Sequence, residues 1–509
     1  MTISIRVMSA GQGYRYLLKS VVAGDRDRDA ASALAGYYTD AGTPPGIWLG
    51  AGLTGLDKLT EGDQVFEEQL RRLMGHGQHP DTGELLGRAY RQFATADQRV
   101  ERRVDRLPKD LDEAERAAQV SAITAEEARK PTGSPVAGFD LTFSAPKSVS
   151  TLWAVSDAGT QVLIAEAHHQ AMKDVLGIIE RDVAMTRIGT EGPRGAVAQV
   201  EVRGVVAAAY DHYDSRASDP QLHTHVVIAN RVQGVHDGKW RTLDSRALHA
   251  AVTGLSEHYN AVLSDHLTRL LDVSWEERER EAGRMPRWEV AGVPQPLMDV
   301  FSSRTKDIER VKHRLVEEYA AKHGRQPSRA QLWQIRQQAT LETRPPKELR
   351  SLHDLTQRWR EQAAQVLGTD AVAWARELVE TGTSEPLLRA DDISLDRVDE
   401  LAAEVVAQVA QRRATWRRWN LHAEAVRQTM PYRFASPADR DAVVSLIVDV
   451  AEAVSLRLTP PELATSPREF QRTDGSSVFR PKASAVYSSE TVLAAEDRLR
   501  EAAARRGVC

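Results

Sequence analysis

Two histidines, His223 and His225, lie one residue apart at the start of an apolar, β-branched run in SDPQLHTHVVIAN, which covers residues 218–230. If this run is a strand, alternate side chains share a face, so both imidazoles point to one side and Thr224 points to the other. Two imidazoles on one face provide half of the ligands of a typical metal site.

A third histidine, His212, lies in AYDHYDSR, on the strand expected just before this one. A turn through ASDP would fold that strand back beside LHTH and would bring three neutral nitrogens around one point. Three-histidine sites with an open position are a common catalytic arrangement. The alternative is that these are ordinary core or surface histidines, since His-x-His also occurs by chance in long chains.

Asp140, in GFDLTFSAPKS, lies on another expected strand. Its carboxylate could accept a hydrogen bond from the second nitrogen of a metal-bound imidazole and so hold that ring in place. An ordinary aspartate at a strand end or turn is the alternative, and the spacing does not decide between the two.

The nucleophile is not one of the common hydrolytic types, because the chain has no G-x-S-x-G, no H-E-x-x-H and no catalytic cysteine context. Tyrosines are few, 11 in all, yet four of them fall within the first forty residues: Tyr14, Tyr16, Tyr37 and Tyr38. A phenol can act as a nucleophile once it loses its proton. Aromatic packing against a lid is the other interpretation.

The elements that would position these residues alternate between strands and helices. Strands are expected for TISIRVM, VAGFDLTFS, AVAQVEVRGVVAAAYDHY and LHTHVVIANRVQG, with HDGKW as a hairpin turn, and helices for PKSVSTLWAV and VLIAEAHHQAMKDVLGIIERDV. Gly and Pro density indicates a loop in AGYYTDAGTPPGIWLGAG. The expected fold class is α+β.

Composition suggests more than one domain in the 509 residues, of which 41% are hydrophobic. We expect a first domain over residues 1–305 with a polar, solvated helical insertion at about 61–130, and a mainly helical region over 306–460. Residues 461–509 are expected to form a polar linker. A P-loop motif is absent from these residues, so no ATPase or helicase activity is expected.

Charge, cysteine content and hydropathy exclude several classes of protein. The net charge of -5 argues against a protein that coats nucleic acid indiscriminately, although a local basic groove remains possible. The single cysteine, Cys509, rules out a disulfide or a Cys-based zinc site within the chain. Without an apolar run of membrane-spanning length, we expect no membrane insertion and a cytoplasmic protein.

Several motifs in order resemble those of MobF-family (TrwC/TraI-type) conjugative relaxases, single-strand DNA nickases of the HUH endonuclease superfamily. They are LTFSAPKSVS preceded by Asp140, DHYDSR followed by DPQLHTHVVIAN, DGKWRTLDSRALH, WEVAGVP and FSSR, and they span roughly residues 1–305. The resemblance implies a palm-like antiparallel sheet with flanking helices in a bacterial protein. It also implies that residues 461–509 contain the start of a helicase-like region that is not completed. His212, His223 and His225 match the metal ligands of the family.

The resemblance also implies a tyrosine nucleophile that nicks a transfer-origin strand and forms a 5'-phosphotyrosine. Many relaxases of this type have two adjacent tyrosine pairs; here Arg15 separates Tyr14 from Tyr16, whereas Tyr37 and Tyr38 remain adjacent. We expect Tyr14 to act first, then Tyr16, with Tyr37 or Tyr38 as the second nucleophile.

Asp140 matches the conserved aspartate of the family, to which either proton abstraction or orientation of a histidine is assigned. We favour orientation, because a carboxylate with a pKa near 4 is a poor base for a phenol. The family implies Mg or Mn as the divalent metal ion, whereas three imidazole nitrogens suit Zn, Ni, Mn or Fe better.

DNA contacts are expected from the charged and aromatic residues in these motifs. The candidates are Lys147, Arg216, Trp240, Trp288, Phe301 and Arg304. Solvated charge or core packing is the alternative for each. The expected partners are single-stranded DNA of a transfer origin and, beyond it, accessory relaxosome proteins and a coupling protein.

Three other functions fit parts of this pattern. A rolling-circle replication initiator would share the histidines and the tyrosine chemistry, but LTFSAPKS and WEVAGVP favour the relaxase. An inactive DNA-binding remnant of a relaxase-helicase would have no reason to retain all three histidines. A small-molecule metalloenzyme would not require the tyrosine cluster.

Overall fold

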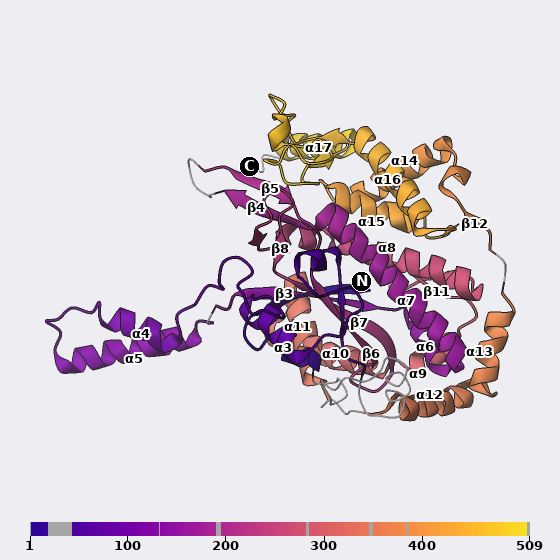
Figure 1. The fold of residues 1–509 in the computed structure, drawn as a ribbon, viewed down its shortest axis with the longest axis horizontal. Helices are drawn as coiled ribbons and strands as arrows, with labels where there is room; N and C mark the ends of the chain where they lie inside the picture. The colour runs from indigo at the N-terminus through magenta and orange to yellow at the C-terminus, as the bar shows by residue number, and fades with distance from the viewer. Residues whose placement is uncertain are drawn as a thin grey trace.

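A sheet lies at the centre of the molecule (Figure 1). It has five strands in the order β1-β3-β7-β6-β2, and each neighbouring pair is antiparallel. The strands are β1 (Ile3–Ser9), β3 (Val136–Ser144), β7 (Pro220–Ala229), β6 (Ala207–Asp214) and β2 (Ile47–Leu49). This computed structural model describes residues 2–18, 43–131, 133–189, 195–280, 285–345, 350–382 and 385–505. The expected α+β class with an antiparallel sheet is confirmed.

One face of the sheet is covered by three helices, α6 (Lys147–Val155), α7 (Ala158–Ile178) and α8 (Ser245–Leu271). Strand residues at alternate positions, such as Leu141 and Ile228, point to these helices and are fully buried in the main core. Burial of a leucine or isoleucine side chain contributes about 1.5–3 kcal/mol, so this layer holds the sheet firmly in place.

The other face of the sheet carries a second core, formed by the chain before β3. It includes α1 (Arg15–Leu18), η1 (Ala51–Gly55), α3 (Glu67–Leu70) and η2 (Arg71–His76). Within residues 61–130, where a solvated helical insertion is expected, the apolar residues before position 95 pack against the sheet. These buried residues are Val65, Leu70, Leu73, Met74 and Leu86.

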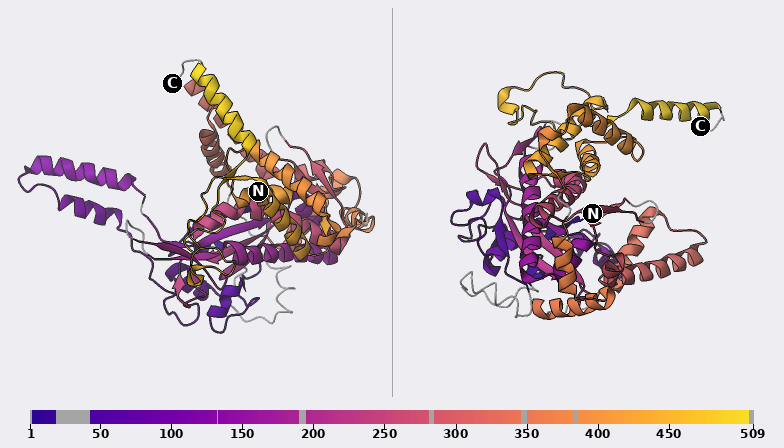
Figure 2. Two further views of the ribbon diagram at one scale, coloured as in Figure 1. Left: turned by 90° about the horizontal axis from the view of Figure 1, so that it is seen from above. Right: turned by 90° about the vertical axis from the view of Figure 1, so that its right-hand side faces the viewer.

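A helical hairpin, α4 (Ala96–Val104) and α5 (Glu113–Arg129), projects from the body of the molecule (Figure 1, Figure 2). Ile123 and Glu127 are its only buried residues. Glu127 accepts from Arg99 at 2.9 Å, so ion pairs rather than an apolar core join the two helices. This hairpin is the exposed helical part of the expected insertion.

Strand β2 lies within a segment whose Gly and Pro content indicates a loop. Trp48 and Leu49 are nevertheless fully buried, and Ile47 pairs with Ala209 of β6. Three residues are too few to display an alternating pattern, so the sequence prediction missed this edge strand.

Three two-stranded sheets are separate from the central one. They are β4 (Met185–Gly189) with β5 (Val197–Glu201), β8 (Val232–Gln233) with β9 (Trp240–Arg241), and β10 (Trp275–Arg278) with β11 (Arg287–Val290). Gly238 has φ 63° in the turn between β8 and β9, which confirms the hairpin turn expected at HDGKW.

The main core continues well beyond residue 305. The helices that follow are α9 (Gln295–Val300), α10 (Ser303–His323), α11 (Arg329–Glu342), α12 (Leu352–Leu367) and α13 (Ala371–Glu380). Trp359 and Ala375 belong to the same buried cluster as the central sheet. The change in composition near residue 305 thus marks helices with one exposed face. Residues up to the end of α13 still belong to the main core, and a different core begins after α13.

A third core lies in the C-terminal helical region. Its main elements are β12 (Leu387–Leu388), α14 (Leu395–Ala410), α15 (Arg418–Gln428), β13 (Arg433–Phe434) and α16 (Pro437–Val454). The guanidinium of Arg440 on α16 lies 2.6 Å from the carboxylate of Asp265 on α8, and both side chains are at most 1% exposed. This ion pair joins the third core to the helices of the first.

The segment expected to be a polar linker packs back on the body. It contains β14 (Leu456–Arg457), η5 (Arg468–Phe470) and β15 (Tyr487–Ser488). The backbone N–H of Gln199 on β5 donates to the carbonyl of Val478 at 2.8 Å. Polar contacts of this kind hold the segment on the body. Its packing could not be predicted from the sequence, because the segment has few apolar residues.

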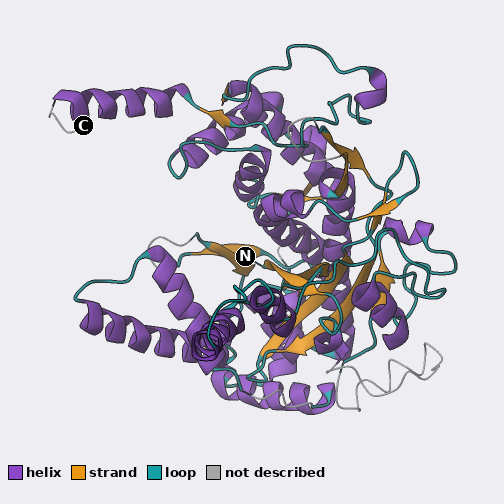
Figure 3. Ribbon diagram, turned by 90° about the vertical axis from the view of Figure 1, so that its left-hand side faces the viewer, coloured by secondary structure: helices purple, strands orange, loops and turns teal. Residues whose placement is uncertain are grey.

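Helix α17 (Glu490–Arg505) projects from the helical region and has no buried residue (Figure 2, Figure 3). Among the described residues, no helix has the length and apolarity needed to cross a membrane.

Candidate metal centre and tyrosine site

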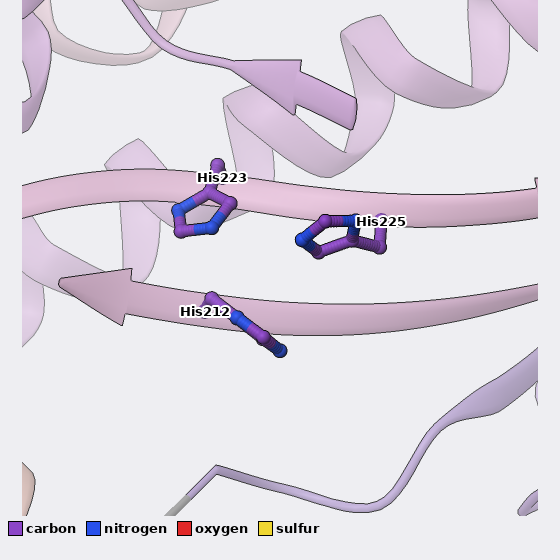
Figure 4. A group of neighbouring side chains, drawn as sticks. All are labelled: His212, His223 and His225. Carbon is purple, nitrogen blue, oxygen red and sulfur yellow. The ribbon is translucent and has the colours of Figure 1, made fainter. Parts of the chain in front are cut away.

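The three histidines lie on two paired strands, with His212 on β6 directly opposite His223 on β7. Their ring centres are separated by 5.1 Å (His212 to His223), 5.0 Å (His212 to His225) and 5.5 Å (His223 to His225), and the rings gather on one side of the strands (Figure 4). One nitrogen from each ring lies within 4.8 Å of the others. The antiparallel pairing expected from the turn through ASDP is confirmed.

Hydrogen bonds to the second ring nitrogens define how two of these imidazoles are protonated. His223 Nδ1 lies 2.8 Å from the carbonyl of Gln221, and a carbonyl can only accept, so Nδ1 carries the proton. His225 Nδ1 lies 2.9 and 3.0 Å from the two oxygens of Asp140 and donates to this carboxylate. Nε2 of both rings therefore keeps a lone pair for a ligand.

This set of donors fits a divalent metal ion. Three imidazoles on one sheet face offer converging nitrogens, and the hydrogen-bonded Asp140 and Gln221 hold two of the rings in orientation. Nitrogen ligands of this kind suit Mn, Fe, Ni, Cu or Zn better than Mg, which prefers oxygen.

Tyr16 on α1 reaches the same site. Its hydroxyl donates to Asp140 Oδ2, and its ring lies edge-on to His225 with 6.1 Å between ring centres. The guanidinium carbon of Arg6 lies 5.7 Å from the centre of the Tyr16 ring. Burial and then the charge of Asp140 raise the pKa of Tyr16 above its ordinary value, so the phenol is protonated in this arrangement.

Tyr14 lies apart from these contacts. Its side chain is 2% exposed and packs in the second core with Met8 and Leu17. Tyr37 and Tyr38 lie outside the described residues. The predicted order of the tyrosines stays a prediction, but Tyr16 is the one whose hydroxyl contacts Asp140.

The family of the chain follows from its sequence as a whole. The model of the TrwC relaxase family matches residues 10–366, well over half of the chain. The chain belongs to the TrwC relaxase family.

Relatives of this TrwC-family chain include the multifunctional conjugation protein TraI of Escherichia coli, which is 36% identical over 178 residues. That match covers 34% of this chain and 9% of TraI. TraI of Escherichia coli strain K12 is 34% identical over 178 residues, again 9% of its length. The chain thus spans a small part of the curated relatives that it matches.

Solved structures of the conjugative relaxase TrwC with oriT DNA are also similar to this TrwC-family chain. Each covers 72% of this chain and 99% of the TrwC chain. The metal-free complex has a TM-score of 0.46 at 24% identity, and the copper-bound complex has a TM-score of 0.48 at 23% identity.

Two of the predicted DNA-binding residues of this TrwC-family chain belong to an arginine cluster. Arg216 follows β6, Arg304 lies on α10, and Arg344 follows α11. Burial, then Arg344 and Arg304, lower the pKa of Arg216, which shows that like charges lie close together. Among the described residues, no carboxylate forms an ion pair with any of the three guanidinium groups.

Lys147 and the aromatic candidates have structural contacts. Lys147 Nζ donates to the carbonyl of Pro220 at 2.9 Å, and burial lowers its pKa to about 8. Phe301 is 1% exposed and offers no face for a base. Trp240 is half-buried against the second core, and Trp288 is half-buried at the main core.

Lys147, Trp288 and Arg304 nevertheless share the lining of one cavity of about 340 Å³. The guanidinium of Arg304 also donates to the carbonyls of Thr340 and Thr343 at 3.2 Å, where α11 ends. These residues therefore have packing roles whether or not they contact DNA.

Sequence reasoning missed Arg6, Gln221 and Arg344. Arg6 could have been found, because it lies in the middle of the strand TISIRVM, where alternation places it on one face with Ser4 and Met8. Gln221 acts through its backbone carbonyl, and Arg344 approaches Arg216 and Arg304 only through the folding of α10 and α11, so neither had a sequence signal.

Proposed function

We propose that this chain nicks and rejoins single-stranded DNA at a specific site of a transfer origin, with Tyr16 as the first nucleophile. The observation that supports Tyr16 is its hydrogen bond to Asp140, which is in turn hydrogen-bonded to His225 of the histidine cluster. A single carboxylate thus joins the candidate nucleophile to the candidate metal centre. This assignment replaces the expectation that Tyr14 acts first.

The proposed reaction is a transesterification at the scissile phosphate. The Tyr16 oxygen forms a bond to phosphorus, the bond from phosphorus to the 3' oxygen breaks, and the products are a 5'-phosphotyrosine and a free 3'-hydroxyl. The proton of the phenol leaves toward Asp140, and the 3' oxygen takes up a proton. Because one phosphate ester replaces another, the same site can run the step backwards and rejoin the ends.

The protein residues contribute position and charge to this step. Asp140 accepts the hydrogen bond of Tyr16 and keeps the phenol oxygen at the site. The phenol is a weak acid with a raised pKa, so it loses its proton only as the bond to phosphorus forms. A divalent metal held by the three histidines would neutralise charge on the phosphoryl oxygens.

Arginines near the site are proposed to hold the phosphates of the strand. Arg6 is exposed beside the Tyr16 ring and could contact the scissile phosphate. Arg216, Arg304 and Arg344 repel each other in the free protein, so an anion between them would relieve that repulsion. We propose that Trp288 and Lys147 have at most a secondary part in binding DNA.

Several parts of the proposal come from family resemblance. Tyr37 or Tyr38 would serve a second transfer, and the metal in the cell would be Mn or Mg, with Zn or Ni allowed by the ligands. The chain would act in the bacterial cytoplasm with accessory relaxosome proteins and a coupling protein.

Covalent capture of DNA tests the function. The full chain is incubated with Mn²⁺ and a library of labelled single-stranded oligonucleotides, and adducts are separated on a denaturing gel and mapped by peptide mass analysis. We expect an adduct on Tyr16 that EDTA abolishes and that Tyr16→Phe lacks, while Tyr14→Phe retains it. An adduct on Tyr14 would instead support the order expected from the sequence, in which Tyr14 acts first. If a saturating library yields no adduct at all, that result contradicts the proposed activity.

A further inference from the structure

A polar cluster lies directly behind the three histidines, on the opposite face of the sheet; Thr224, His168 and Tyr259 are buried, whereas the side chains of Asp211 and His169 are 23% and 39% exposed. Asp211 and Thr224 are register partners on β6 and β7, each adjacent in sequence to candidate metal ligands. The same face is otherwise apolar along these strands, with Ala209, Val226 and Ile228 in the main core. The interruption of an apolar face by an aspartate and a threonine, at this one place, calls for a physical reason.

The hydrogen bonds of this cluster have one consistent direction. Thr224 Oγ1 donates to Asp211 Oδ1 at 2.5 Å, because a carboxylate only accepts. The threonine oxygen must then accept from His168 Nε2, which lies 2.8 Å away. His168 Nδ1 keeps a lone pair and accepts from the hydroxyl of Tyr259 at 2.6 Å.

The protonation states agree with this direction. Burial lowers the pKa of His168 to about 3, so its ring is neutral and can accept through Nδ1. Asp211 is ionised: burial acts to raise its pKa, but the charge and hydrogen bonds of His169 and the hydrogen bond of Thr224 hold its pKa at about 2. His169 Nε2 completes the cluster at 3.0 Å from Asp211 Oδ2.

The cluster connects four elements. His168 and His169 lie on α7, Tyr259 lies on α8, and Asp211 and Thr224 lie on the two histidine-bearing strands. Apolar packing would also bury these strands, but it tolerates small sliding and rotation, whereas hydrogen bonds fix distance and direction. Polar groups are costly to bury without partners, so a fully satisfied cluster at this place favours a positioning role.

We propose that Thr224, Asp211 and His168 are positioning residues that fix the backbone of β6 and β7 beneath the metal centre, so that the three imidazoles converge on one ion. The proposal rests on the proposed function only in that a metal binds at the histidines. Thr224 is the key member, because it lies between His223 and His225 and its side chain points to the opposite face.

The test compares metal affinity without DNA. Thr224→Val keeps the shape and removes the hydroxyl, Thr224→Ser keeps the hydroxyl, and Thr186→Val is a matched control. Thr186 is fully buried and donates one hydrogen bond, to the carbonyl of Thr242 at 2.8 Å, on a strand that carries none of the histidines. Mn²⁺ affinity is measured by calorimetry on the full chain, and site geometry by the visible absorption of bound Co²⁺.

We expect Thr224→Val to weaken Mn²⁺ binding by about tenfold, within the range known for residues that support metal ligands, and to alter the Co²⁺ spectrum. Thr224→Ser should restore both, and Thr186→Val should melt earlier with unchanged affinity. Unchanged affinity in Thr224→Val, or an equal loss in Thr186→Val, would overturn the proposal. If Thr224→Val does not fold, the same measurements are made on Tyr259→Phe, which removes the hydrogen bond at the other end of the cluster, and the same outcomes decide.

Failure of this proposal is distinguishable from failure of the proposed function. Wild-type protein that binds metal but cuts no strand leaves the affinity comparison intact, and the comparison alone then decides. If the wild-type protein cuts DNA and Thr224→Val binds metal with normal affinity, the positioning role is excluded and the proposed nicking function stands. Wild-type protein that binds none of the metals contradicts this proposal, and the adduct assay then decides the nicking activity separately.

Discussion

Asp140 serves two residues at once, because its carboxylate accepts from both the Tyr16 hydroxyl and His225 Nδ1. The two roles assigned to this aspartate, orienting a histidine and receiving a proton, are therefore compatible in one geometry. A carboxylate that already accepts from an imidazole is held in place, so the hydroxyl of Tyr16 finds its acceptor at a fixed position.

Removing the charge of Asp140 should weaken metal binding. In Asp140→Asn the side-chain oxygen still accepts from His225, but the negative charge that raises the basicity of the imidazole is lost. We expect Mn²⁺ affinity to fall by about 10- to 100-fold, measured by calorimetry. Asp237→Asn, on the exposed turn between β8 and β9, is the control and should bind metal like wild type; equal affinities in all three proteins would exclude this role of Asp140.

Lys147 gives a prediction about pH. Burial lowers its pKa from 10.5 to about 8, so between these values the unfolded chain binds more protons than the folded chain. Stability contributed at this position therefore rises as the pH increases from about 8 to 10.5. The melting temperature of wild type minus that of Lys147→Met should increase over this pH range. A difference that stays constant with pH would show that the lysine is not desolvated.

At the scale of elements, the sequence predicts those strands and helices that have a clear hydrophobic period. The histidine-bearing strands, their antiparallel pairing and the helices α6 and α7 could be predicted, because each has a clear period and Gly, Pro or Asp residues at its ends. Strand β2 could not, because it is three residues long. The contact of Tyr16 with Asp140 joins residues 124 positions apart, and no local pattern reports such a distance.

The α4–α5 hairpin should be dispensable for folding. A Cβ placed on Gly133 would lie 2.7 Å from the ring of Phe93, so the two ends of the hairpin meet at its base. Replacing residues 95–131 by two glycines should keep the melting temperature within about 2 °C of wild type, since the hairpin buries almost nothing. A decrease of more than about 5 °C in calorimetry would show that the hairpin stabilises the body.

At the scale of the whole molecule, helix α8 joins the main core to the third core. The third core docks on α8 through Arg440, which also donates to the carbonyl of Tyr432 at 2.8 Å. Its partner Asp265 accepts from the backbone N–H of Phe434 at 3.1 Å. Helix α8 also covers the central sheet, so the same helix connects the C-terminal region to the layer behind the histidines.

Breaking this ion pair on one side should destabilise the protein strongly. Arg440→Met leaves a buried, unpaired carboxylate, and we expect a loss of about 3–5 kcal/mol in the free energy of unfolding. The double variant Asp265→Leu with Arg440→Met removes the unpaired charge and should recover part of that loss. Urea denaturation measures both, and a double variant less stable than Arg440→Met would show that Asp265 stabilises the fold through its other contact, the backbone N–H of Phe434.

The three histidines all lie within residues 212–225, on one hairpin, whereas Asp140 is 85 positions from His225 and Tyr16 a further 124 from Asp140. Closing a short loop costs little conformational entropy, so contacts within a hairpin form early during folding and distant ones form late. A partly folded chain can therefore gather its histidines before any tyrosine reaches them. If Tyr16 is the nucleophile, as proposed, the centre is complete only once the N-terminal segment has docked, and metal capture would precede any nicking of DNA.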